Sequence, residues 1–163
     1  SHFQERFNAP MLWNSNFLMS PESMKILRLL VDVWLPDFKF GPGKCALKLS
    51  RTKDYWPTVA GNLTLLRDWG EAFTIRHLVM PNHIDCCTKP ILDWIASNMP
   101  HALVNIMDQF HPETFTNPRS SRYQPRFADL SRRPTSNELD QAFRYAGELG
   151  LEFESLTFEK TVA

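Results

Sequence analysis

The chain repeats one pattern four times: a short apolar segment predicted to be a strand, followed by a segment with helical periodicity. The clearest strand candidate is residues 31–39, VDVWLPDFK, where Val31, Val33 and Leu35 alternate with other residues. Strands that alternate with helices are typical of α/β proteins with a parallel sheet and right-handed crossovers. The other predicted strands are 10–16, 73–80, 102–107 and 151–158, and the predicted helices are 20–30, 57–69, 88–99 and 135–149.

Two of the predicted helices begin at residues suited to capping. Thr135 is followed three residues later by Glu138, which is the spacing of a capping box. Thr88 precedes the helix that contains Pro90, so we expect Thr88 to cap it. Between the last two helices lies a polar segment, 111–133, which is too long for an ordinary connection and is therefore either functional or mobile.

Composition limits the class of protein. A length of 163 residues suits one domain over 1–163, and 43% apolar residues can form a substantial core. The formal net charge is zero, so no basic surface for nucleic acid is expected. No apolar run approaches the roughly 20 residues that span a bilayer. The three cysteines lack disulfide-framework spacing, which predicts free thiols in a reducing, cytoplasmic compartment.

Polar side chains stand where the predicted strands end. Asp37 and Lys39 are two positions apart, so they should point to the same side of their strand. In parallel sheets built from strand–helix repeats, ligands bind at the carboxyl ends of the strands. Lys39 or Arg76 could bind a carboxylate, and Asp37 could bind an ammonium group or a small cation. The other strand-end residues are Asn14, Ser15, Asn16, His83 and His111.

Several of these residues also have a purely structural interpretation. Arg76 could be an ion-pair partner within the fold, and His77 is expected to pack or to face solvent. His83 lies near Cys86 and Cys87, but the spacing matches no zinc motif, so we assign no metal site. The arginines within 111–133 are interpreted as a solvated loop. No arrangement typical of nucleophilic catalysis is present, so no catalytic residue is assigned.

Five segments together resemble a known family: LWNSN, VDVWLPDFKFG, IRHLVMPNH, CTKPILDWIA and VNIMDQFHP. In this order they resemble the C-terminal part of radical S-adenosylmethionine (SAM) proteins, specifically the group similar to pyruvate formate-lyase activating enzyme. The resemblance implies a parallel β/α partial barrel with SAM bound across the strand ends. It also implies an oxidoreductase in which a [4Fe–4S] cluster, held by a CxxxCxxC loop, cleaves SAM reductively. Activating enzymes then abstract hydrogen from a glycine of a partner protein.

The resemblance assigns cofactor-binding roles to particular residues. Asn14, Ser15 and Asn16 correspond to the Asp-Thr-Asn strand end near the amino-acid portion of SAM. Asp37 and Lys39 match the family's Asp-x-Lys, which contacts SAM or its accompanying cation. All five roles are expectations that the resemblance implies.

The resemblance also covers Arg76 and His111, but the chain departs from the family pattern at several positions. Arg76 matches the arginine before the Pro turn, and His111 falls where a SAM-contacting histidine follows the later strand. Asn14 replaces an acid, and Phe17 stands where the activating enzymes have glycine. The CxxxCxxC motif is absent, and the three cysteines of this chain cannot supply it. The resemblance therefore predicts the C-terminal half of a longer enzyme, with the cluster ligands elsewhere.

The leading hypothesis is that this chain carries part of a SAM pocket and that a glycyl-radical-type protein is its partner. If so, the unpaired edge of strand 11–16 should cause self-association. The alternative is a non-catalytic α/β domain that binds a small anionic ligand or a partner protein. A third hypothesis is a mononuclear metal hydrolase that uses His83 and His111.

Overall fold

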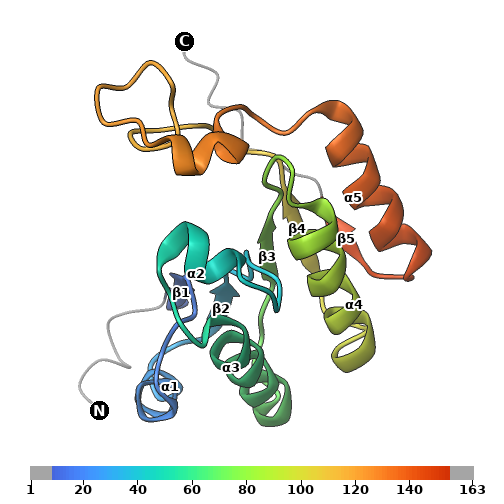
Figure 1. Cartoon of the computed structure of the whole chain (residues 1–163). Helices are drawn as coiled ribbons and strands as arrows, with labels where there is room; N and C mark the ends of the chain where they lie inside the picture. Colours follow the sequence, from blue (N-terminus) through green and yellow to red (C-terminus); the bar gives the residue numbers. More distant parts are fainter. Residues whose placement is uncertain (1–8, 155–163) are drawn as a thin grey trace.

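The computed structural model describes residues 9–154, and within them five parallel strands form two adjoining sheets, one of β1 and β2 and one of β3, β4 and β5 (Figure 1). β1 pairs with β2, β3 with β4, and β4 with β5. Isolated bridges from Trp34 to Phe73 and from Asp37 to Arg76 join β2 to β3. The predicted α/β class with parallel strands is confirmed. The strands are β1 (Leu12–Ser15), β2 (Val33–Pro36), β3 (Ile75–Leu78), β4 (Val104–Met107) and β5 (Phe153–Glu154).

The strands lie side by side in the same order as in the sequence, β1 to β5. A doubly wound sheet reverses its strand order at a switch point, and the described strands show no such reversal. Right-handed crossovers that always step in one direction place their helices on one face of the sheet. The sequence pattern alone did not distinguish an open, doubly wound sheet from part of a barrel. The observed strand order is that of a partial barrel, as the resemblance implied.

The helices begin and end near the predicted residues. The capping box is confirmed, because the Thr135 side chain accepts from the Glu138 backbone and the Glu138 side chain accepts from the Thr135 backbone. The prediction that Thr88 caps a helix is wrong: a π-helix runs directly into α4, and the Thr88 hydroxyl bonds to His77 instead. The helices are α1 (Pro21–Leu27), α2 (Cys45–Ser50), α3 (Tyr55–Trp69), the π-helix η1 (Ile84–Thr88), α4 (Lys89–Asn98), the 3-10 helix η2 (Pro125–Leu130) and α5 (Ser136–Glu148).

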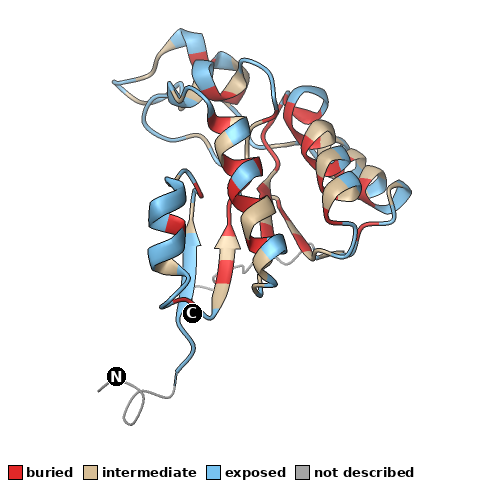
Figure 2. Ribbon diagram, turned by 90° about the horizontal axis from the view of Figure 1, so that it is seen from below, coloured by how far each residue is buried: buried red, intermediate tan, exposed pale blue. Residues whose placement is uncertain are grey.

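The sheet buries one face much more completely than the other (Figure 2). His77 lies on the buried face, where its Nδ1–H donates to the Phe38 carbonyl and its Nε2 accepts from Thr88. Phe38 packs between Trp56 and Trp94 from the helices. The buried strand residues that share this face are Trp34, Ile75, His77, Val104 and Ile106.

The opposite face, which we call the open face, carries the alternate strand residues. Parallel register places Leu35 beside Asn14 and Arg76 beside both Asp37 and Asn105. Most of these side chains are exposed or half-buried, although Asp37 is buried. In a complete barrel this face would be the interior. Of the predicted site residues, Asn14, Asp37 and Arg76 lie on the open face, whereas Ser15 lies on the other face by register.

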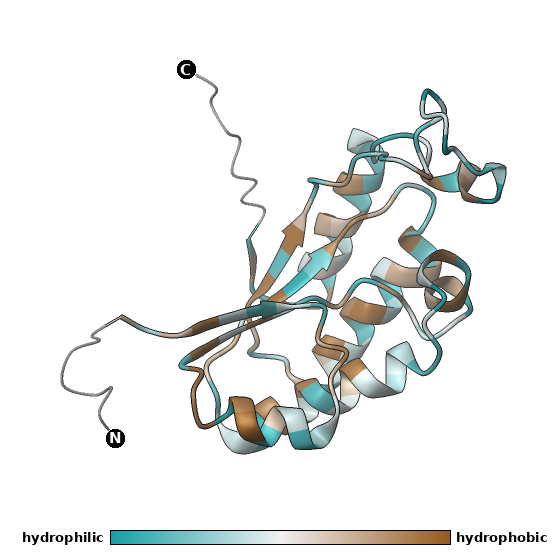
Figure 3. Cartoon of the chain, turned by 90° about the vertical axis from the view of Figure 1, so that its left-hand side faces the viewer, coloured by the Kyte–Doolittle hydropathy of each residue, from teal (hydrophilic) through white to brown (hydrophobic). Residues whose placement is uncertain are grey.

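One edge of the molecule is apolar and exposed (Figure 3). Within residues 9–154, β1 pairs only with β2, and Leu12 on it is 55% exposed. Ile26 in α1 is exposed, and beyond the helix Leu29 is 83% exposed and Leu30 is also exposed. None of the described helices is long and apolar enough to cross a membrane. Of the predicted last strand, residues 155–158 lie outside the described part of the chain.

Candidate functional site

Four of the residues predicted from the strand ends meet at the carboxyl end of the sheet, and we call them the strand-end cluster: Asn14, Asp37, Lys39 and Arg76. The Lys39 Nζ lies 2.8 Å from the Asp37 Oδ2. The Arg76 Nη1 lies 3.5 Å from the Asp37 Oδ1 and also donates a hydrogen bond to the Asn14 Oδ1. The expectation that Asp37 and Lys39 point the same way is confirmed.

Tyr55 and Phe38 hold the backbone around the strand-end cluster in place. The Tyr55 hydroxyl at the start of α3 accepts from the Lys39 N–H at 2.8 Å and donates to the Asp37 carbonyl at 3.3 Å. Burial raises the pKa of Tyr55 to about 12, so the phenol stays protonated and can donate. Phe38, the residue between Asp37 and Lys39, is fully buried among aromatic side chains of the helices, which holds this part of the backbone in place. The two charged side chains are consequently presented from a rigid segment.

The charges of the strand-end cluster are unbalanced. One carboxylate faces two cations, and the side chains of Asp37 and Arg76 are only 11% and 20% exposed. The Asp37 Oδ1 is buried without a hydrogen-bond partner, because 3.5 Å to Arg76 is too long for one. Buried polar atoms are normally paired. The cluster can therefore accept a ligand that brings both a carboxylate and a hydrogen-bond donor.

Ser15 and Asn16 lie next to the strand-end cluster but are engaged in their own turn. The Ser15 Oγ accepts from the Phe17 N–H, and the Asn16 Oδ1 accepts from the Leu18 N–H. Phe17 has φ +60°, the left-handed conformation that favours glycine, and it is fully buried. The turn thus has a backbone conformation that favours glycine, although a phenylalanine occupies the position. Asn62 holds this turn by donating to the Phe17 carbonyl.

His111 lies apart from the strand-end cluster in its contacts. It follows β4, its side chain is 53% exposed, and its Nε2 lies 2.7 Å from the Glu113 Oε1. This hydrogen bond with Glu113 raises the pKa of His111. Neither of the described hydrogen bonds of His111 reaches the strand-end cluster. Its predicted role in binding SAM stays a prediction.

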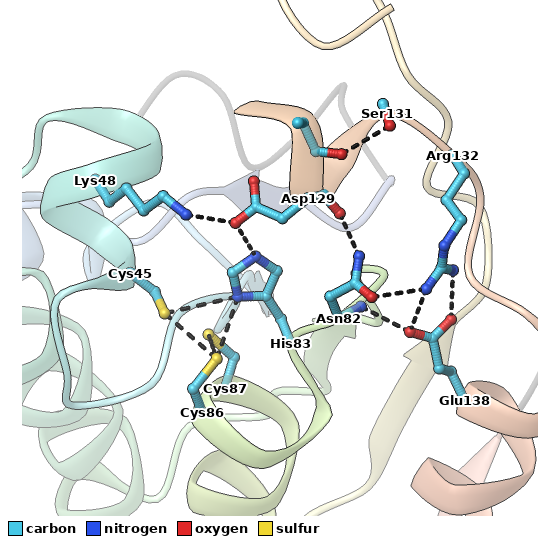
Figure 4. Close-up of polar contacts among 11 residues, drawn as sticks. Cys45, Lys48, Asn82, His83, Cys86, Cys87, Asp129, Ser131, Arg132 and Glu138 are labelled. Atoms are coloured by element: carbon cyan, nitrogen blue, oxygen red, sulfur yellow. Dashed lines mark hydrogen bonds and ion pairs between the residues drawn. The ribbon is translucent and has the colours of Figure 1, made fainter. Parts of the chain in front are cut away.

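A second group of side chains, the cysteine–histidine cluster, lies beneath the 111–133 segment (Figure 4). It consists of Cys45 at the start of α2, His83 before η1, and Cys86 and Cys87 within η1. The four ligand atoms all lie within 4.8 Å of one another. Sequence spacing missed this cluster, since Cys45 is distant in sequence from the others. The signal was the His83, Cys86, Cys87 group, and the fold adds the chain's remaining cysteine.

Comparison with known proteins establishes the fold and leaves the activity open. No family model matches the chain. An uncharacterized protein of Methanocaldococcus jannaschii is 41% identical over 146 residues, which cover 89% of this chain and 40% of that protein. The chain therefore spans about two-fifths of the length of this relative. The structure is similar to a domain of pyruvate-formate lyase-activating enzyme from Bacteroides vulgatus, with a TM-score of 0.63, 12% identity, and coverage of 91% of this chain and 81% of that one.

Proposed function

We propose that this chain supplies part of the SAM pocket of a radical SAM enzyme similar to pyruvate formate-lyase activating enzyme. The observation that carries the proposal is the strand-end cluster, in which Asn14, Asp37 and Arg76 from three successive parallel strands meet on the open face. These residues also carry the sequence resemblance to that family. The similarity in fold to the Bacteroides vulgatus domain supports the same assignment.

The strand-end cluster fits the amino-acid portion of SAM, which carries one carboxylate and one ammonium group. Arg76 and Lys39 provide the positive charge for the carboxylate, and Arg76 can do so with two parallel hydrogen bonds. The Asp37 Oδ1, which has no hydrogen-bond partner, can accept from the ammonium group. SAM bound beside a reduced iron–sulfur cluster would supply the radical that abstracts a hydrogen atom from the substrate. The contribution of this chain is to bind and orient the ligand.

The cysteine–histidine cluster does not fit a [4Fe–4S] cluster. Each iron of such a cluster takes its own thiolate, so the thiolates stand apart around a cube. Here the sulfur and nitrogen atoms converge on one point, within 4.8 Å of one another, and the sequence lacks CxxxCxxC. In the proposed enzyme the cluster ligands therefore come from outside this chain, and no reaction step is assigned to these cysteines.

The exposed apolar edge supports a larger assembly of strands. The side of β1 that no strand within residues 9–154 covers, and the exposed residues Ile26, Leu29 and Leu30, are where another strand and helix would pack in a longer barrel. The Methanocaldococcus jannaschii relative has more than half of its length outside the matched region. A glycyl-radical-type protein is the partner that this function predicts.

The proposal is tested by reading the coding DNA directly upstream of Ser1. An in-frame extension that contains CxxxCxxC supports it, and the full-length protein, purified without oxygen, should then be brown and should cleave SAM when reduced. If a start codon lies just before Ser1 and no such extension is present, or if the full-length protein stays colourless and does not respond to SAM, the proposal is wrong. A domain that binds a small anionic ligand at the strand-end cluster would then be the better description.

A further inference from the structure

We propose that Cys45, His83, Cys86 and Cys87 bind a single zinc ion in a tetrahedral site. The ion would tie α2 to the π-helix that follows β3. Such a site is separate from the strand-end cluster and does not depend on the proposed SAM chemistry. All three cysteines of the chain take part, which is unlike the scattered placement expected of cysteines that merely fill the core.

The distances between the ligand atoms match those around a tetrahedral zinc ion. Zn–S bonds of about 2.3 Å and Zn–N bonds of about 2.0–2.1 Å imply S···S separations of about 3.8 Å and S···N separations of about 3.5 Å. The Cys86 Sγ lies 3.4 Å from the Cys45 Sγ and 3.9 Å from the Cys87 Sγ. The His83 Nδ1 lies 3.2 Å from the Cys86 Sγ and 3.6 Å from the Cys45 Sγ. These four separations need changes of only a few tenths of an ångström, and the other two, from Cys87 to Cys45 and to His83, are within 4.8 Å.

The backbone holds the ligands at these positions. Cys45 is the first residue of α2, and the π-helix η1 places the adjacent Cys86 and Cys87 so that both sulfurs lie near His83. Gly41 lies against η1 so closely that a Cβ there would be 2.0 Å from the Cys86 carbonyl oxygen.

The residues around the cluster are those that commonly support a zinc-binding histidine. The Nδ1 of His83 faces the sulfurs, while its Nε2 is buried without a hydrogen-bond partner and lies 3.5 Å from the Asp129 Oδ2 in η2, near enough for a hydrogen bond after a small shift of the ring. A carboxylate behind a ligating histidine fixes the ring and raises its basicity. Lys48 donates to Asp129 and brings positive charge near a site where three thiolates outnumber the charge of one zinc ion.

The first test is metal content. The full chain is produced with zinc supplied, purified without chelators and with oxygen excluded, and examined by native mass spectrometry and elemental analysis. We expect one zinc per chain and three thiols that react only after a strong chelator is added. Replacement of zinc by cobalt should give the visible bands of tetrahedral Co²⁺ and a near-ultraviolet thiolate-to-cobalt band.

Variants assign the ligands. Cys45→Ser and His83→Gln should each weaken zinc binding by at least tenfold, whereas His101→Gln, an exposed histidine elsewhere, should leave it unchanged. Zinc-supplied protein that is folded, free of zinc and has three reactive thiols would overturn the proposal. So would a Cys45–Cys86 disulfide in oxygen-free protein, or iron with inorganic sulfide at these cysteines. The wild-type measurement decides the question even if a variant fails to fold, and its result is independent of SAM binding.

Discussion

Substitution of Gly41 by alanine should destabilise the protein because the added methyl group has no space. The new Cβ would lie 2.0 Å from the Cys86 carbonyl oxygen and 3.0 Å from both the Cys86 carbonyl carbon and the Cys87 Cα. All three contacts are with backbone, which cannot rotate aside as a flexible side chain can. Either the loop or η1 must therefore move by roughly 1 Å, and overpacking of this kind costs about 1–3 kcal/mol. We expect the upper end of that range.

The free energy of unfolding is measured by urea denaturation, followed by tryptophan fluorescence, for Gly41→Ala and two matched controls. Gly43→Ala meets no atom within 4 Å and should change stability little. Gly61→Ala, on the exposed side of α3, also meets no atom within 4 Å and should stabilise the protein by about 0.5–1 kcal/mol, because alanine favours helix. Of the three variants, we expect only Gly41→Ala to bind zinc more weakly than the wild type, because only its added methyl group displaces η1.

A Gly41→Ala protein with the stability and zinc affinity of the wild type would refute this reasoning. It would mean that the loop is not pressed against η1 and that the cysteine–histidine cluster is not held in the geometry described. A loss of stability in Gly43→Ala equal to that in Gly41→Ala would also contradict the account, since the effect would then arise from any side chain in this loop.

Three other predictions concern acid stability and self-association. Burial lowers the pKa of His77 to about 4, from a usual value of 6.5. The unfolded chain therefore binds the proton more readily, and stability should fall as the pH drops from about 6.5 to 4, while NMR shows a His77 ring that stays neutral until the pH approaches 4. The hydrogen bond from Arg132 lowers the pKa of Glu138 to about 2 from 4.5. The ionised Glu138 therefore contributes fully to stability above pH 4.5, and this contribution is lost as the pH falls from 4.5 to about 2. Glu138→Gln should make stability depend less on pH over this range. The isolated chain should self-associate through its apolar edge, and Leu12→Lys with Leu29→Lys should reduce this in light scattering; a wild-type chain that stays monomeric at high concentration would contradict the prediction.

Local sequence signals predicted the elements, because each depends on residues close together in the chain. The alternation in residues 31–39 placed β2, and the spacing of Thr135 and Glu138 placed the start of α5. The same alternation brought Asp37 and Lys39 to one side of the strand, and the structure places Arg76 and Asn14, which were also predicted at the strand ends, in contact with them. This part of the site was predictable because parallel strands end at a common edge.

Contacts between distant segments were not predictable from spacing. Cys45 reaches His83 only because the loop after β2 folds back over the end of β3, and no local pattern records that path. Thr88 is a residue type that commonly caps helices, but its hydroxyl forms a hydrogen bond with the buried His77 ring. A π-helix also precedes α4 directly, so the helix does not begin at Thr88. Ser15 and Asn16 were grouped with the strand-end residues, whereas their side chains bond to the turn that follows β1.

The central claim, that the strand-end cluster binds SAM, is tested most directly by the affinity of the full-length gene product for SAM. Arg76→Met removes the cluster's arginine, and Arg67→Met removes an exposed arginine on α3 that pairs with Asp68. Isothermal titration should show SAM bound by the wild type and by Arg67→Met with equal affinity, and bound at least about tenfold more weakly, or 1.4 kcal/mol, by Arg76→Met. Equal affinity in Arg76→Met, or no binding by the folded wild type, would contradict the account.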